Sequence, residues 1–139
     1  MSISVNKAYL FFAGALLVSV GLYISTNPLN YVVSLGADGT STLVSSIRVD
    51  IPLQVNLLSE LRGMGGCLTM IGLFASLGAM VSKWQSNALM ISTLVFSSFV
   101  IFRSLGMIVD GMPDGIVIFA YGIETLFASS GIALMLLKE

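Results

Sequence analysis

Two acidic and two basic residues interrupt or begin the apolar stretches of this chain. They are Glu60 and Arg62 in "NLLSELRGMGG", Arg103 in "VIFRSLGMIVDG" and Glu124 in "YGIETLFASSG". Carboxylates and guanidinium groups form charge-assisted hydrogen bonds, and one planar guanidinium can bridge two carboxylates. Ionisable side chains within a membrane usually mark a ligand, ion or proton site. These four side chains are therefore the first candidates for a functional site.

The composition indicates that these charges lie in a membrane protein. The 139 residues are 56% hydrophobic and 9% charged, with a mean hydropathy of +0.99. A soluble domain carries about a quarter charged residues, and a chain this poor in charge could not cover its own surface. The net charge is -1 and no basic cluster occurs, which argues against a nucleic-acid partner.

The residue types also exclude several kinds of chemistry. The chain has no histidine and one cysteine, Cys67, so it has no internal disulfide and no histidine base. Histidine is also a common ligand of zinc and haem iron. The sequence therefore predicts no metal site and specifies no cofactor, and an enzyme is the least favoured class.

Four apolar segments predict an all-α fold, a four-helix transmembrane bundle that forms a single domain over residues 1–139. The spans are expected at about 8–24, 57–82, 87–109 and 116–137, each near the ~20 residues that cross a bilayer. The short connections "KWQSN" and "DGMPDG" predict antiparallel neighbours. The first run is long for a cleaved signal peptide and lacks a small-residue cleavage site, so a retained helix is favoured.

The longer connection, residues 25–55, is expected outside the cytoplasm and to contain a short helix. Asn27 is the expected N-cap, Pro28 the first helical residue and Gly36 the end. Residues 45–51 alternate in polarity and predict an extended segment. Pro52 then begins the second spanning helix.

The distribution of lysine and arginine predicts the orientation. One side carries Lys7, Lys83 and Lys138, and the other carries Arg48, Asp38, Asp50, Asp110 and Asp114. Cytoplasmic loops are enriched in basic residues. We therefore expect a multi-pass protein of the bacterial inner membrane with both termini in the cytoplasm.

The spacing of the charges predicts a buried network in the outer half of the bundle. Arg103 lies ~10 Å below the end of the third span and Glu124 ~14 Å into the fourth. We expect Arg103 to pair with Glu124, and Arg62 with Glu124 or Glu60. The expected surroundings include Asn56, Tyr121, Asp110 and the backbone at Gly63 and Gly66. Such a network either joins the helices or forms a binding site, and the sequence leaves both open.

A stripe of small residues follows the network along the second span. It consists of Gly65, Thr69, Gly72, Ser76 and Ala79, at alternating spacings of four and three. Small residues allow close helix contact in lipid. The stripe is expected to face the first span, through Gly14, Val18 and Gly21, or a second copy of the protein.

The run "ELRGMGG" with the downstream pattern R…DG…E resembles a bacterial membrane family known as domain of unknown function 4345. The resemblance covers nearly the whole chain and implies a four-helix inner-membrane protein. It marks as motif residues Asn56, Glu60, Arg62, Gly63, Gly66, Arg103, Asp110, Gly111 and Glu124. It implies no activity. A more distant likeness, at the level of fold, is to small DoxX-type membrane proteins.

These observations favour a non-enzymatic accessory or binding protein, as a subunit of a larger complex or a binder of lipid or a small ligand. The expected partners are the lipid bilayer and either a second copy or a larger membrane complex. The alternative is a small transporter with Glu124 as the coupling acid.

Overall fold

The computed structural model describes residues 5–35, 51–113 and 115–137 and is helical over most of them. The elements are α1 (Val5–Thr26), α2 (Pro28–Leu35), α4 (Ile51–Met80), the short 3-10 helix η1 (Ser82–Trp84), α5 (Gln85–Val109) and α6 (Gly115–Leu136). Four of these stretches are long and apolar enough to cross a membrane: Val5–Thr26, Val55–Met80, Ser82–Val109 and Gly115–Leu136. The all-α fold with four spanning helices is therefore confirmed.

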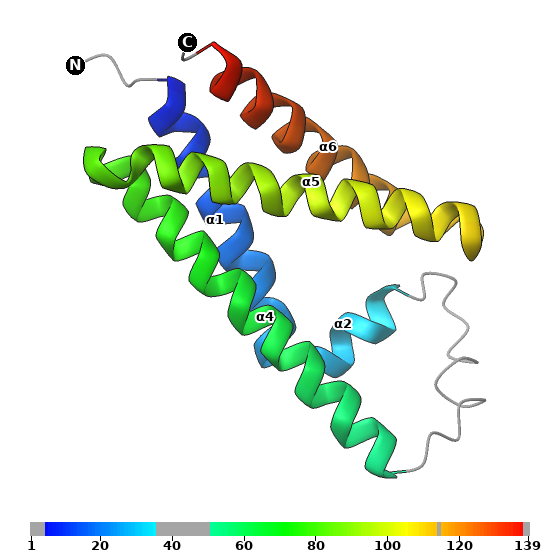
Figure 1. Cartoon of the computed structure of the whole chain (residues 1–139). Coiled ribbons are helices and arrows are strands. Elements are labelled where there is room, and N and C mark those ends of the chain that lie inside the picture. The colour runs from blue at the N-terminus through cyan, green and yellow to red at the C-terminus, as the bar shows by residue number, and fades with distance from the viewer. Residues whose placement is uncertain (1–4, 36–50, 114, 138–139) are drawn as a thin grey trace.

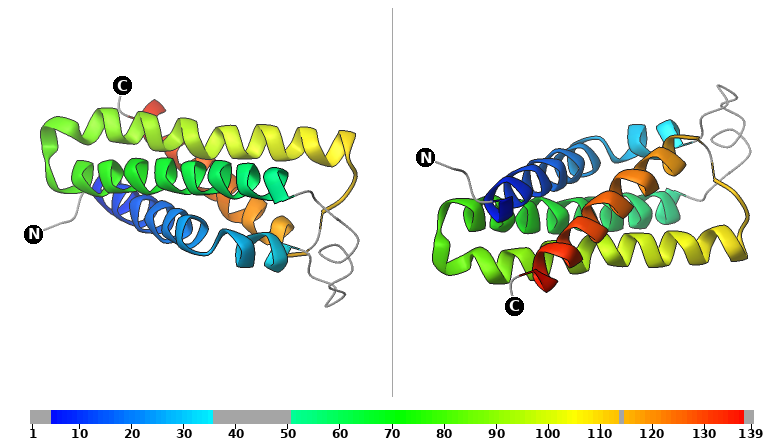
Figure 2. Two further views of the ribbon diagram at one scale, coloured as in Figure 1. Left: turned by 90° about the horizontal axis from the view of Figure 1, so that it is seen from below. Right: turned by 90° about the horizontal axis from the view of Figure 1, so that it is seen from above.

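The long helices form two arms that meet at η1. In Figure 1, α1 lies beside α4 in one arm, and α5 diverges from α4 as both leave η1. The views of Figure 2 show α6 crossing the other helices obliquely. The beginning of α1, the end of α6 and η1 share one end of the molecule, as four spans require. Lys7 and Lys83 also lie at this end.

The contact between α1 and α4 is a close-packed seam. A Cβ atom built on Gly14 would lie 2.7 Å from the carbonyl oxygen of Gly72, and one on Gly21 would lie 2.6 Å from that of Gly65. Only glycine permits such an approach, because a Cβ atom would overlap the backbone of the other helix. Small residues in general allow helices to pack closely in lipid. The small-residue stripe of α4 thus faces α1, which decides between the two partners left open by the sequence.

Proline lies in the first turn of both α2 and α4, where its missing N–H group breaks no helical hydrogen bond. Pro28 is the first residue of α2, and Pro52 is the second of α4. The 30 residues of α4 make it about 45 Å long, longer than the hydrocarbon of a bilayer. The short helix in the first connection and the long second helix are both as predicted.

The core lies where α1, α4, α5 and the second half of α6 meet. The Tyr9 hydroxyl donates a hydrogen bond to the carbonyl of Phe127 at 3.2 Å. The Phe96 and Phe127 rings stack with their centroids 4.9 Å apart. Aromatic pairs in this range add to the stability given by their burial. These contacts fix the C-terminal half of α6 against α1 and α5.

Several predictions fall outside the described residues. They concern the helix end at Gly36, the extended segment 45–51, and the positions of Asp38, Arg48, Asp50, Asp114 and Lys138.

Candidate functional site

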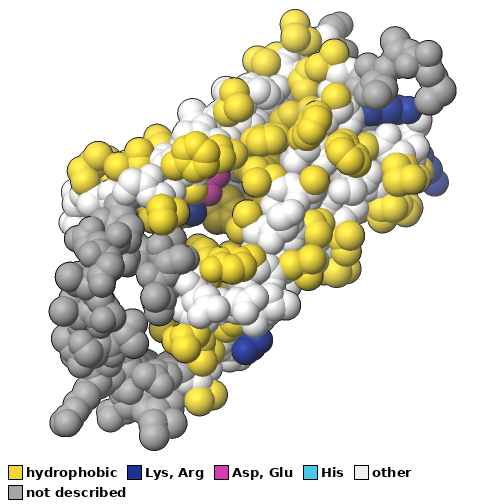
Figure 3. Space-filling view, turned by 180° about the vertical axis from the view of Figure 1, so that it is seen from behind, with side chains coloured by type: hydrophobic (Ala, Val, Ile, Leu, Met, Phe, Trp, Pro, Cys, Tyr) yellow, Lys and Arg dark blue, Asp and Glu magenta, His cyan; other side chains and the backbone are white. Residues whose placement is uncertain are grey.

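An apolar cleft opens between the two arms. Its volume is about 810 Å³, within the ~300–1,000 Å³ of typical ligand sites. Figure 3 shows it as a hollow edged by hydrophobic side chains, with acidic and basic atoms beside it. Its lining consists of Leu16, Leu17, Ser19, Val20, Tyr23 and Ile24 of α1, Tyr31 of α2, Met64 and Leu68 of α4, Phe96, Ser98, Phe99, Phe102 and Arg103 of α5, and Ile116, Val117, Phe119, Ala120, Ile123 and Glu124 of α6.

The cleft exists because α6 touches α1 along only part of its length. Gly131 lets the C-terminal half of α6 approach Tyr9 and Thr93 closely. The N-terminal half carries larger side chains, including Ile116 and Ile123, and these line the cleft instead of an interface with α1. Their apolar surface faces the cavity, so the site is built mainly to hold apolar groups.

One ion pair supplies the charge of the cleft. Arg103 Nε lies 2.8 Å from Glu124 Oε2, and the two side chains are 25% and 12% exposed. The guanidinium carbon also lies 5.7 Å from the centroid of the Phe99 ring, within the range of cation–π attraction. Among the described lining residues these two alone are charged. The cleft thus combines apolar walls with one ion pair whose net charge is zero.

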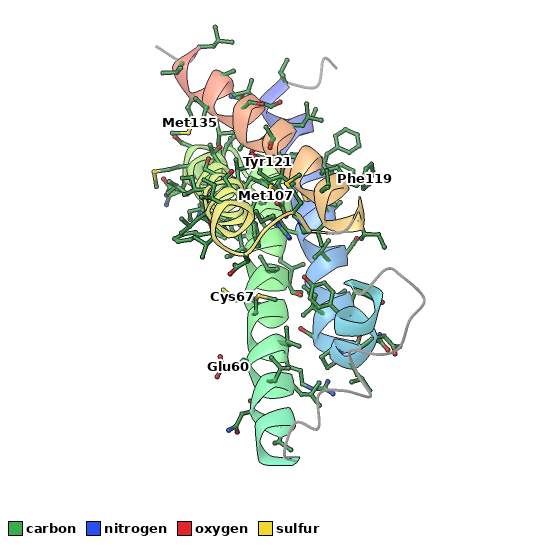
Figure 4. All side chains as sticks on the ribbon, turned by 90° about the vertical axis from the view of Figure 1, so that its right-hand side faces the viewer. Glu60, Cys67, Met107, Phe119, Tyr121 and Met135 are labelled. Atoms are coloured by element: carbon green, nitrogen blue, oxygen red, sulfur yellow. The ribbon has the colours of Figure 1, made fainter. Side chains whose placement is uncertain are left out.

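A hydroxyl pair beside the ion pair joins α5 to α6 a second time. The hydroxyls of Ser104 and Tyr121 lie 3.0 Å apart, and Ser104 also donates to the carbonyl of Val100 at 2.7 Å. Tyr121 therefore bonds Ser104, whereas we expected it beside Glu124. It supports the α5–α6 interface that carries the ion pair, and Figure 4 places it in the region where these two helices meet.

A second, smaller hollow is also lined by Arg103. It has a volume of about 220 Å³ and is lined by Arg103, Gly106, Met107, Asp110, Gly111, Pro113 and Val117. Arg103 and Val117 line both cavities. Arg103 thus belongs both to the apolar cleft and to a hollow at the α5–α6 turn that Asp110 also lines. Asp110 itself is exposed.

The predicted four-residue network is wrong. Among the described residues, a single ion pair joins Arg103 to Glu124, and neither Glu60 nor Arg62 belongs to it. Side chains that are two residues apart on a helix point in directions that differ by about 200°. Glu60 and Arg62 therefore cannot converge on one point. The divergence of α4 from α5 then separates this part of α4 from the ion pair. Figure 4 shows Glu60 extending from α4 on the side away from α1.

Arg62 instead holds the end of α1. Its Nη1 donates to the carbonyl of Ser25 at 2.7 Å, and the Ser25 hydroxyl donates to the carbonyl of Arg62 at 3.2 Å. The last carbonyls of a helix lack intrahelical partners and carry partial negative charge, so a guanidinium there is stabilising. Arg62 is thus a cap at the end of the seam, one helical turn before Gly65.

The other motif residues of α4 also lie apart from the ion pair. Asn56, Glu60 and Gly63 are exposed, and Gly66 is half-buried. A Cβ built on Gly63 or Gly66 would meet no atom of the described chain within 4 Å. The sequence predicted that the backbone at these two glycines lies beside the charges, and this prediction is wrong. No set of three potential metal ligands occurs among the described residues.

Sequence reasoning missed the apolar lining of the cleft. Residues of α1 such as Val20 and Tyr23 face it, yet they look like any lipid-facing residues in the sequence. It also missed Ser25 and Ser104, the partners of Arg62 and Tyr121. Ser104 directly follows Arg103, which was the one available signal for it.

The sequence matches, over residues 5–135, the family described as Domain of unknown function (DUF4345). The chain belongs to this family. Its match covers all four spanning helices, including the cleft and the ion pair. No curated protein and no solved structure matches the DUF4345 chain. The likeness to DoxX-type proteins thus remains a prediction.

Proposed function

We propose that this DUF4345 protein is a non-enzymatic binding protein of the membrane, and that the cleft between its arms holds a lipidic ligand. The single observation that carries the proposal is the cleft of about 810 Å³ whose apolar walls converge on the Arg103–Glu124 ion pair. Ligand sites are mostly apolar with a few polar groups that fix orientation. An amphipathic molecule would place its apolar body along the walls and its polar head at the pair.

The internal hydrogen bonds of the lining support this assignment of roles. Ser19 donates to the carbonyl of Ala15 and Ser98 to that of Val95, both at 2.8 Å. These two hydroxyls are satisfied by their own helices, so apart from the tyrosines Tyr23 and Tyr31 the uncharged walls are apolar. The Arg103–Glu124 pair is then the principal point at which a polar head can be bound.

Blocking the cleft tests the proposal. Ala120 is a small lining residue of α6, and Ala120→Trp fills the space beside it. Leu126→Trp is the matched control, because Leu126 lies on the same helix, is 63% exposed and does not line the cleft. We expect lipid extracted from gently purified wild type and Leu126→Trp to be enriched in one class at about one molecule per chain. Ala120→Trp should lose this enrichment in mass spectrometry of the extract.

We also propose that the protein is an accessory subunit of a larger membrane complex, and the same preparations test this role. Native mass spectrometry gives the number of copies per particle, bound lipid and any companion subunit. If the lipid of all three preparations matches the bulk membrane, the cleft holds only solvating lipid and the binding proposal fails. Any defined companion subunit would identify the larger membrane complex in which the protein acts.

Transport is the second candidate, and the two cavities that share Arg103 favour it. Glu124 lines the cleft, and its partner Arg103 lines both the cleft and the smaller hollow. Transport predicts a proton flux in proteoliposomes that contain a pH-sensitive dye, abolished by Glu124→Gln. Ligand binding predicts no flux above that of empty liposomes.

We further propose that the protein lies in the bacterial inner membrane with both termini in the cytoplasm. The support is the shared end of α1, η1 and α6, which carries Lys7 and Lys83, and the enrichment of basic residues in cytoplasmic loops.

A further inference from the structure

The charges around the polar point of the cleft sum to zero. Arg103 contributes one positive charge and Glu124 one negative charge, and they lie 2.8 Å apart. The remaining described lining residues are uncharged. A ligand that brought a net charge to this point would therefore lack a countercharge in the lining, except by separating the pair.

Asp110 offers no compensation to an anionic head. It lines the smaller hollow together with Arg103 and is exposed, and as an acid it adds no positive charge to this region. An ionised head placed within a membrane without a free countercharge costs several kcal/mol. An anionic phosphate or carboxylate head thus meets the Glu124 carboxylate and a guanidinium that is already paired with it.

The pair is nevertheless able to bind a neutral head. The Arg103 side chain is 25% exposed and the Glu124 side chain 12%. A guanidinium has five N–H donors, and one ion pair through Nε leaves the terminal donors for other acceptors. A carboxylate accepts hydrogen bonds from hydroxyl groups. A hydroxyl or carbonyl oxygen matches both partners and brings no charge.

We propose that the ligand of this cleft is an uncharged amphiphile, with a hydroxyl or carbonyl head at Arg103 and Glu124 and its apolar body along the walls. This inference rests on the proposed function, because it names the ligand class of the same cleft. It selects acylglycerols, long-chain alcohols and similar molecules over phospholipids and fatty acids.

Two probes that differ only in their head groups test the inference. Dioleoylglycerol has an uncharged hydroxyl head, and dioleoyl phosphatidic acid has the same chains with an anionic head. Each is titrated into the purified full-length protein, and bound lipid is counted by native mass spectrometry. We expect wild type to bind dioleoylglycerol about tenfold more tightly or better, given the cost of an unpaired charge.

Variants of the pair change the charge of the site in a defined way. Glu124→Gln leaves Arg103 unpaired, and we expect its preference to move toward phosphatidic acid by about tenfold. The double variant Arg103→Glu/Glu124→Arg restores a sum of zero and should keep the preference for dioleoylglycerol. If Glu124→Gln does not fold, the preferences of the wild type and the double variant for dioleoylglycerol over phosphatidic acid still test the inference.

The outcomes separate the two proposals. If wild type binds both probes equally or prefers phosphatidic acid, and Ala120→Trp loses both, then the cleft binds lipid and the inference of a neutral ligand is overturned. If Ala120→Trp binds both probes as wild type does, the cleft is not the binding site and the proposed function fails. Loss of dioleoylglycerol alone in Ala120→Trp supports both.

Discussion

The two faces of α1 meet very different surroundings. On one face, Gly14 and Gly21 contact the backbone of α4 so closely that no Cβ atom would fit. On the other, Val20 and Tyr23 line a cleft of about 810 Å³. One helix thus forms a close-packed seam with α4 and also a wall of the cleft.

The difference shows that small residues hold one helix interface of this protein together and polar pairs hold another. In lipid, apolar side chains gain little by leaving the bilayer for one another, so helices associate through close packing and hydrogen bonds. The seam uses close packing along its length. The α5–α6 pair uses the Arg103–Glu124 and Ser104–Tyr121 contacts. Between α1 and the N-terminal half of α6 neither device occurs among the described residues, and the cleft remains.

Breaking the ion pair on one side should have the largest effect. Arg103→Leu leaves the Glu124 side chain, which is 12% exposed, without its partner. Removing one member of a buried pair typically costs about 3–5 kcal/mol, so we expect a stability loss of about 3 kcal/mol in reversible unfolding in mixed detergent. Arg103→Leu/Glu124→Leu should recover most of it. An equally unstable double variant would show that the pair is not the stabilising unit.

The seam should respond to a single methyl group. Gly72→Ala places a Cβ 2.6 Å from the backbone nitrogen of Val18, and overpacking costs about 1–3 kcal/mol. Gly66→Ala is the control on the same helix, because nothing in the described chain lies within 4 Å of its Cβ. The control should be neutral or stabilising by up to about 1 kcal/mol, since glycine is a poor helix former. Equal unfolding curves for the two variants would contradict a close seam.

The smallest effect is expected at the end of the seam. Arg62→Ala removes the donor to the Ser25 carbonyl and should cost about 1 kcal/mol, because this exposed charged hydrogen bond competes with water. Glu60→Ala, two residues away on an exposed position, should change stability by less than about 0.5 kcal/mol. Comparable losses in both variants would instead indicate that this part of α4 has a further partner, such as a second copy.

Much of the fold could be predicted from local residue patterns. The four apolar runs, the proline at the start of α2 and the stripe from Gly65 to Ala79 each specify a helix or a contact face without reference to distant residues. The pairing of Arg103 with Glu124 also followed, because a short turn fixes the relative depth of two antiparallel helices.

The site could be predicted only in part, because depth along a helix does not give direction around it. Glu60 and Arg62 were placed at a suitable depth, but Arg62 turns to the end of α1 and Glu60 turns away from it. The cleft itself had no sequence signal, since its apolar lining matches residues that face lipid.

The sequence by itself determined that this is a four-span membrane helical protein, because a hydrophobic run of this length must satisfy its backbone hydrogen bonds within a helix. It also determined which residues could let α1 and α4 approach. Only the tertiary structure decided that α5 diverges from α4 and that α6 contacts α1 through its C-terminal half, leaving the cleft beside one ion pair. The physical reason is that crossing angles depend on side chains from several helices at once, and no single segment encodes them.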